Sequence, residues 1–98
     1  MIGKSRQRGI PDRTESEAIA AAAFAFIAED AGRLAQFMET TGVDFATLRA
    51  RLASGEMLEA ALGYLLGDES ALLTFAAGAG IAPERIAPAL AILQRAER

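Results

Sequence analysis

The chain has 98 residues, of which 52% are hydrophobic, carries a formal net charge of −3, and contains neither cysteine nor histidine. That length accommodates one domain with a modest core, and the missing residue types exclude disulfides and the usual protein ligands of haem and iron–sulfur clusters. Alanine is the commonest residue and β-branched residues are few, so the composition predicts an all-α fold without a bound cofactor.

The first 13 residues differ from the rest of the chain in composition. They show no hydrophobic period, contain glycine and proline, and are predicted to form a flexible basic tail before a single helical domain over residues 14–98. The charged residues of this tail are Lys4, Arg6, Arg8, Arg13 and one acid, Asp12. Because residues 14–98 carry an excess of acids, only the tail is expected to attract nucleic acid.

Thr14 is predicted to open the first helix, because Thr14 and Glu17 have the spacing of a capping box, and this helix runs to about Glu29. It contains an unbroken apolar run over residues 18–28, too short to cross a bilayer, which needs about 20 residues. Acids directly before this run, such as Glu15, argue against a secretory signal. We therefore expect a cytoplasmic protein that does not enter the membrane.

The second helix is predicted to begin at Asp30, whose carboxylate can accept hydrogen bonds from the free N–H groups of the first turn. Its inward residues recur every three or four positions: Leu34, Phe37, Met38 and Thr41. Gly42 can adopt the left-handed conformation that ends a helix, with Val43 packing back on Met38 as in a Schellman ending.

Asp44 is predicted to cap a third, shorter helix in the same way. The residues expected to face its core side are Phe45, Leu48 and Leu52. The residues expected to face solvent are Arg49 and Arg51.

Three further helices follow. Ser54 is predicted to cap the fourth, which ends at Gly67, and Asp68 to cap the fifth, which ends at Gly80. The sixth opens at Pro83, and Pro88 lacks the N–H of a regular turn, so this helix is kinked or begins properly only near Pro88. The inward residues expected here are Leu72, Phe75 and Ala76 in the fifth helix and Ile86, Leu90 and Leu93 in the sixth.

Residues 16–53 align without a gap on residues 54–91, which predicts a compact six-helix bundle made of two tandem three-helix repeats. The informative identities are Asp30 with Asp68, Leu34 with Leu72, Phe37 with Phe75, and Gly42 with Gly80. Two such units would close on each other about a pseudo-twofold axis. The alternative is coincidence among amphipathic helices.

The first and fourth helices are apolar on nearly every side, which predicts burial on more than one face and a central position. Ala25 and Gly63 are small and equivalent in the proposed repeat. We therefore predict that these two helices cross closely at that point.

No catalytic pattern stands out. The acid pairs Glu29–Asp30 and Asp68–Glu69 lie at predicted helix starts and are interpreted as caps, while the hydroxyl groups have no neighbouring base to activate them. Tyr64, the only tyrosine, is predicted to pack in the core with its hydroxyl at an edge, and ligand contact is the alternative. We therefore predict no catalytic, cofactor-binding or metal-binding residue and a protein that is not an enzyme.

The run Gly63–Ile86, together with LRARLA at Leu48–Ala53, resembles a family of small bacterial helical proteins known only as a domain of unknown function. The likeness covers roughly residues 16–93 and rests on helix caps and an apolar stripe. It implies a bacterial cytoplasmic setting and no enzymatic role.

Three functions follow as hypotheses. The first is a protein-interaction module, which binds an unidentified protein or a second copy through helix faces that one core does not cover, with Leu73, Ile92 and Ala76 as the expected exposed residues. The second is a nucleic-acid or ribosome-associated factor that makes weak contacts through the basic tail. The third, an enzyme or small-molecule binder, would need a deep pocket lined by Tyr64 and converging acids.

Overall fold

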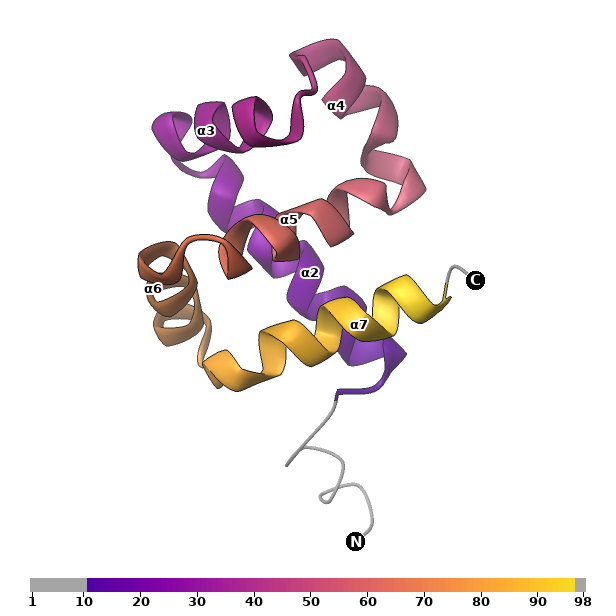
Figure 1. Cartoon of the computed structure of the whole chain (residues 1–98), viewed down its shortest axis with the longest axis vertical. Helices are drawn as coiled ribbons and strands as arrows, with labels where there is room; N and C mark the ends of the chain where they lie inside the picture. The colour runs from indigo at the N-terminus through magenta and orange to yellow at the C-terminus, as the bar shows by residue number, and fades with distance from the viewer. Residues whose placement is uncertain (1–10, 97–98) are drawn as a thin grey trace, which may run out of the picture.

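The computed structural model describes residues 11–96, and within that range the chain is all-helical without a strand. The predicted all-α fold with six helices is confirmed (Figure 1). The α-helices are α2 (Arg13–Ala28), α3 (Ala31–Thr41), α4 (Phe45–Arg51), α5 (Glu56–Leu66), α6 (Glu69–Ala79) and α7 (Ile86–Ala96). Two 3-10 turns, η1 (Leu52–Ser54) and η2 (Pro83–Arg85), precede α5 and α7. The predicted flexible tail lies mostly outside the described residues.

Helices α2, α5 and α7 form the centre of the molecule, each packing against the other two (Figure 1). The central position predicted for α2 and α5 is therefore confirmed, and α7 joins them. Helix α3 packs on α2 and α5, and α6 also contacts both. Helix α4 has α5 as its main helical neighbour, and α4 and α7 lie at opposite ends of the view in Figure 1.

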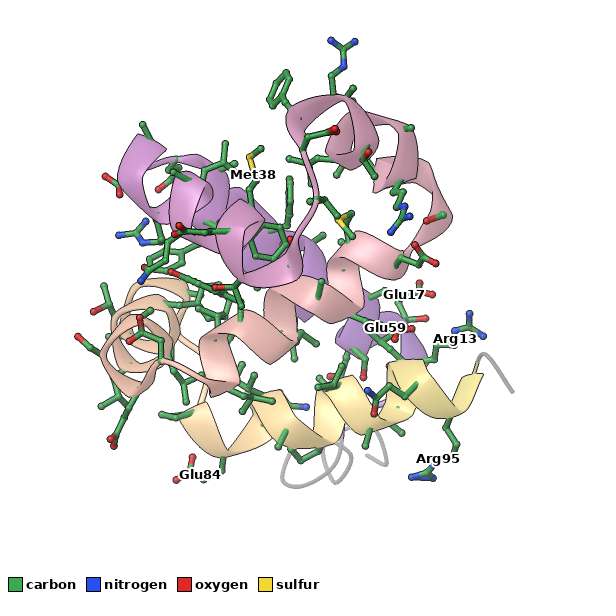
Figure 2. All side chains as sticks on the ribbon, turned by 45° about the horizontal axis from the view of Figure 1, so that its top comes forward. Arg13, Glu17, Met38, Glu59, Glu84 and Arg95 are labelled. Carbon is green, nitrogen blue, oxygen red and sulfur yellow. The ribbon has the colours of Figure 1, made fainter. Side chains whose placement is uncertain are left out.

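Alanine allows the three central helices to approach one another. Ala20 and Ala23 of α2, Ala61 of α5 and Ala89 of α7 are all fully buried. Larger side chains fill the space around these contacts: Ile19, Ile27, Phe37, Leu48, Met57, Leu62, Tyr64, Leu65, Phe75, Ile86 and Leu93. Charged side chains such as Glu84 and Arg95 point away from the helices (Figure 2). One core therefore holds the described residues together.

Three of the predicted helix starts are confirmed, and each depends on an aspartate. The carboxylates of Asp30, Asp44 and Asp68 accept hydrogen bonds from backbone N–H groups three residues later, at 2.9, 2.7 and 3.1 Å respectively. Each aspartate has an extended backbone that directs its side chain back over the first turn.

The predicted start of the first helix at Thr14 is wrong by two residues. Asp12 is the N-cap of α2: its carboxylate accepts from the Glu15 N–H at 2.7 Å, and the Glu15 carboxylate accepts from the Asp12 N–H at 3.0 Å. Asp12 and Glu15 have the same spacing as Thr14 and Glu17, and aspartate is a better N-cap residue than threonine. The Glu15 carboxylate also pairs with Arg85 at 3.4 Å, which links the start of α2 to η2.

The prediction that Ser54 caps the fourth helix is wrong. The chain forms the η1 turn and then passes through Gly55, which is the N-cap of α5, before the helix begins at Glu56. Gly55 has a φ of 89°, a left-handed backbone conformation that residues with a side chain disfavour. The Ser54 hydroxyl donates to the Arg51 carbonyl at 2.8 Å and accepts from the Glu56 N–H at 3.3 Å. Ser54 thus stabilises the turn rather than opening the helix.

The predicted helix endings at Gly42 and Gly80 are confirmed, since both residues have a left-handed backbone. The Gly42 N–H donates to the Met38 carbonyl at 2.8 Å. At the second ending, the Ile81 N–H also donates to the Ala76 carbonyl at 3.0 Å. In the last helix, the break expected from Pro88 takes the form of a 3-10 turn, η2, that leads into α7 at Ile86.

The two predicted repeats share local features but differ in packing. Asp30 and Asp68 cap their helices alike, and Phe37 and Phe75 are both buried. The third helices of the two units differ, because α7 packs along α2 and α5 whereas α4 rests mainly on α5. The tandem duplication and its pseudo-twofold axis therefore stay predictions.

We predict that Phe37→Ala lowers the free energy of unfolding by about 3–5 kcal/mol, because Phe37 is fully buried and its loss leaves a cavity. Its ring meets those of Phe24 and Tyr64 edge-on at 6.0 and 5.7 Å. Urea unfolding at low protein concentration measures the change. The matched control is Phe45→Ala, which removes an exposed ring and should cost less than about 0.5 kcal/mol. Equal losses in the two variants would contradict the core described above.

Candidate functional site

Helix α4 and the η1 turn that follows it expose apolar side chains that the sequence pattern assigned to the core. Of the three predicted inward residues, only Leu48 is buried, whereas Phe45 is 57% exposed and Leu52 is 41% exposed. The prediction was wrong for Phe45 and Leu52 because α4 has only seven residues and rests mainly on α5, which covers one side of its apolar face.

Three of the exposed side chains in and after α4 share one side of the chain. Phe45 and Arg49 of α4 and Leu52, the first residue of η1, are spaced by four and three positions, which aligns them along successive helical turns. We call these three residues the α4 stripe. The neighbouring Arg51 instead pairs with Glu56 at 3.6 Å, and both side chains are at least half exposed, so this pair adds little stability. The α4 stripe therefore presents two large apolar side chains beside one guanidinium group.

A second apolar surface lies between α2 and α6. Ala22 and Ala25 of α2 and Gly78 and Ala79 of α6 line a depression of about 440 Å³ together with Phe26 and Phe75. The two phenylalanine rings pack together with their centroids 5.5 Å apart, and Glu29 and Thr74 also line this space. We call this depression the α2/α6 groove.

The close crossing predicted at Ala25 and Gly63 is wrong. Ala25 is exposed and lines the α2/α6 groove, and Gly63 is exposed on α5 with open space where a Cβ atom would lie. The buried face of α2 instead carries Ile19, Ala23 and Ile27. Because α2 is apolar all round, its sequence did not indicate which side the other helices would cover.

A polar depression of about 350 Å³ surrounds Tyr64, between α3, α5 and α6. Tyr64 is buried, and its hydroxyl donates to the Gln36 side-chain carbonyl oxygen at 2.9 Å, as expected of a core tyrosine with a polar edge. Asp30 and Asp68 also line this depression, but their carboxylates cap α3 and α6. The acids thus converge near Tyr64 as helix caps.

Arg33 lies in the same depression and contacts α2. Its guanidinium lies 4.0 Å from the centroid of the Phe26 ring and donates to the Phe26 carbonyl at 2.8 Å. This pair of contacts closes the end of α2 onto α3. Arg33 therefore has a structural role in the polar depression.

Burial raises the pKa of Tyr64 above its usual value, and the negative charge of Asp68 raises it further. Both effects favour the neutral phenol. The neutral phenol can keep donating its hydrogen bond to Gln36.

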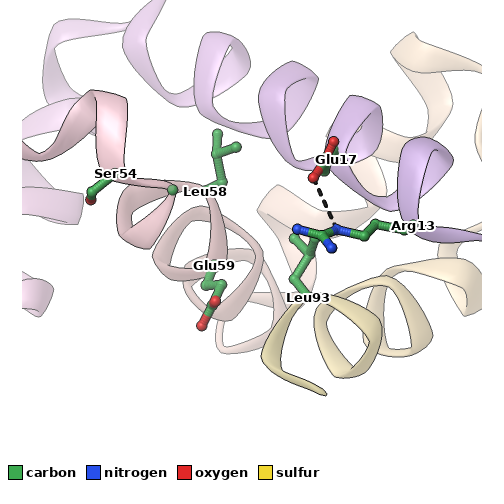
Figure 3. A pocket seen from close by; sticks show the side chains of 7 residues that line it. Arg13, Glu17, Ser54, Leu58, Glu59 and Leu93 are labelled. Atoms are coloured by element: carbon green, nitrogen blue, oxygen red, sulfur yellow. Dashed lines mark hydrogen bonds and ion pairs between the residues drawn. The ribbon is translucent and has the colours of Figure 1, made fainter. Parts of the chain in front are cut away.

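A third, smaller depression of about 190 Å³ lies where the starts of α2 and α5 meet the end of α7, lined by Leu58 and Leu93 among others (Figure 3). Arg13 and Glu17 border it and form an ion pair at 3.2 Å. Arg13, predicted as part of the basic tail, is thus the first residue of α2 and already pairs with an acid. The other basic tail residues, Lys4, Arg6 and Arg8, lie outside the described residues.

The three residues predicted to be uncovered differ in exposure. Leu73 is 47% exposed, Ile92 is half-buried, and Ala76 is buried. The burial of Ala76 confirms its predicted inward position in the fifth helix and contradicts its place among the residues expected to be uncovered. Ala76 turns inward because it adjoins Phe75 on the side of α6 that meets the core. Sequence reasoning missed the exposure of Phe45 and Leu52, which were predicted to face the core, and it did not single out Leu66, which is 38% exposed at the end of α5.

Over residues 11–96, no single helix is both long and apolar enough to cross a membrane. Helix α6 and the segment Pro83–Arg95 are long and apolar enough only when taken together, and the chain bends by 108° between them. The described part of the chain also holds no group of three or more acidic side chains placed to bind a metal ion.

Residues 13–96 match a protein family whose description is Protein of unknown function (DUF3572), and the chain belongs to this family. The resemblance to a helical family of unknown function, expected from the sequence, is therefore confirmed. No curated protein and no solved structure matches the chain.

We predict that Tyr64 titrates above its usual pKa of about 10 in the folded protein and near that value in urea. Ultraviolet absorbance reports this ionisation cleanly, because the chain has one tyrosine and no tryptophan. Since the pKa of Tyr64 is higher in the folded state than in the unfolded state, the neutral phenol contributes to the free energy of unfolding. This contribution is complete below about pH 10 and is lost as pH rises through the folded pKa.

Asp68→Asn should lower the folded midpoint of this titration, since it removes a nearby negative charge and keeps a capping oxygen. Glu69→Gln, which removes a charge at the next residue, is the matched control and should shift the midpoint less. A folded midpoint at or below that in urea would contradict the burial of Tyr64.

Proposed function

We propose that this chain is a protein-interaction module that binds another protein through the α4 stripe, catalyses no reaction, and works in the bacterial cytoplasm. The observation that carries the proposal is the exposure of Phe45 on α4 and of Leu52 at the start of η1, on either side of the buried residue Leu48. Aromatic residues and arginine dominate the energetics of protein interfaces, and the stripe combines Phe45 with Arg49.

The state of the polar groups also supports an interaction role. Tyr64 bonds to Gln36, Arg33 bonds to the end of α2, and Asp30 and Asp68 cap helices. These groups are occupied by structural contacts, which leaves the exposed apolar surfaces as the features that the fold does not use. The cytoplasmic and bacterial setting rests on the family resemblance of the sequence.

The alternative, a nucleic-acid or ribosome-associated factor, depends on the basic residues before the helical domain. Arg13 belongs to α2 and pairs with Glu17, so this alternative now rests on Lys4, Arg6 and Arg8. Three charges would give weak, salt-sensitive binding.

Affinity capture from bacterial lysate tests the proposal, with the full chain compared with Phe45→Ala/Leu52→Ala. The proposal predicts that the full chain retains a protein that the double variant loses. Leu66→Ala/Leu73→Ala is the matched control, because it removes two leucines that are also exposed but lie elsewhere, and it should retain the protein.

A third version lacks residues 1–10 and tests the alternative. The deletion stops there because Pro11 is buried and Asp12 caps α2. Protein and RNA in the eluates are both identified. Recovery of RNA that depends on residues 1–10, with no protein that depends on Phe45 and Leu52, would refute the interaction module and favour the nucleic-acid role.

A further inference from the structure

The α2/α6 groove has the form of a site for a helix. Its walls are helix backbones with small side chains, Ala22 and Ala25 on one side and Gly78 and Ala79 on the other, and phenylalanine rings line it as well. Helices bind such grooves through apolar residues spaced by about one or two turns. The groove therefore fits an amphipathic helix that offers at least one large apolar side chain.

The α4 stripe has matching dimensions. Phe45 and Leu52 are seven residues apart, and so are Ala22 and Glu29, which mark the extent of the groove along α2. Seven residues correspond to about 10 Å along a helix. The α4 stripe, which runs from α4 into η1, can thus cover the length of the groove.

Charge is also complementary between the two surfaces. Arg49 lies between Phe45 and Leu52 in the α4 stripe, and Glu29, which is exposed, lies at one end of the groove. Opposite charges at the edge of an apolar contact steer partners into register and disfavour wrong ones.

We infer that the partner of the α4 stripe is the α2/α6 groove of a second copy of this chain. This inference rests on the proposed function and names its partner. Phe45 enters the groove over Phe26 and Phe75, and Arg49 pairs with Glu29. Each copy carries both surfaces, so the stripe of one copy can bind the groove of the next.

Sedimentation velocity of the full chain over a range of concentrations tests this inference. The wild-type chain should associate as concentration rises. Phe45→Ala should weaken the association at least about tenfold, as expected for an aromatic anchor. Leu73→Ala, at a residue of similar exposure on α6 outside the groove, should leave it unchanged.

The groove is tested from its own side by filling it. Gly78→Leu places a side chain in the groove, where a Cβ atom meets no neighbour within 4 Å, and it should weaken association at least about tenfold. Gly63→Leu is the matched control, because Gly63 is also helical and equally open but lies on α5 outside the groove. Both variants should fold, since leucine favours helix more than glycine does.

A charge exchange tests the pairing of the two surfaces. Arg49→Glu and Glu29→Arg should each weaken association about tenfold, and the double variant should restore it, because every copy then carries both reversed charges. Arg95→Glu, which reverses the charge of an exposed residue on α7, should have little effect on association.

Three results would overturn the inference. The first is a wild-type chain that stays monomeric up to about 1 mM, a concentration at which even weak contacts populate a dimer. The second is a variant that weakens self-association no more than its control does. The third is a double charge variant that associates no more tightly than the single variants. If the chain is monomeric but captures a different protein through Phe45, the proposed function stands and the second copy is not its partner.

Discussion

The close approach of α2, α5 and α7 is the constraint on which the rest of the structure depends. Fully buried alanines on all three helices, such as Ala23, Ala61 and Ala89, bring their backbones near one another, and larger residues such as Leu62 and Ile86 fill the remaining space. A core of this kind needs few large side chains, which suits a short chain rich in alanine. It also concentrates burial in three helices and leaves the others partly uncovered.

The two exposed surfaces follow from that arrangement. Helix α4 is short and packs mainly on one central helix, α5, so Leu48 is buried while Phe45 and, at the start of η1, Leu52 stay exposed. On α2, the alanines that do not face α5 or α7 form one wall of the α2/α6 groove, and α6 forms the other. The proposed self-association uses both of these surfaces, the α4 stripe and the α2/α6 groove.

The helix boundaries could be predicted largely from sequence because caps act locally. Asp30, Asp44 and Asp68 need only the N–H groups three residues later, and Gly42 and Gly80 need only a free backbone conformation. Thr14 and Ser54 were misassigned because Asp12 and Gly55 offered competing local solutions. The candidate site was missed, since exposure of Phe45 and of Ala25 depends on which neighbours reach them, and the apolar pattern of a helix does not contain that information.

The central claim is that α2, α5 and α7 carry the stability of the fold while α4 is held weakly. Native-state hydrogen exchange at low protein concentration tests it most directly, because it reports the opening free energy of each amide. The amides of α2, α5 and α7 are expected to exchange only through global unfolding, and those of α4 through a local opening of much lower free energy. Amides of α4 as strongly protected as those of α2 would contradict the account.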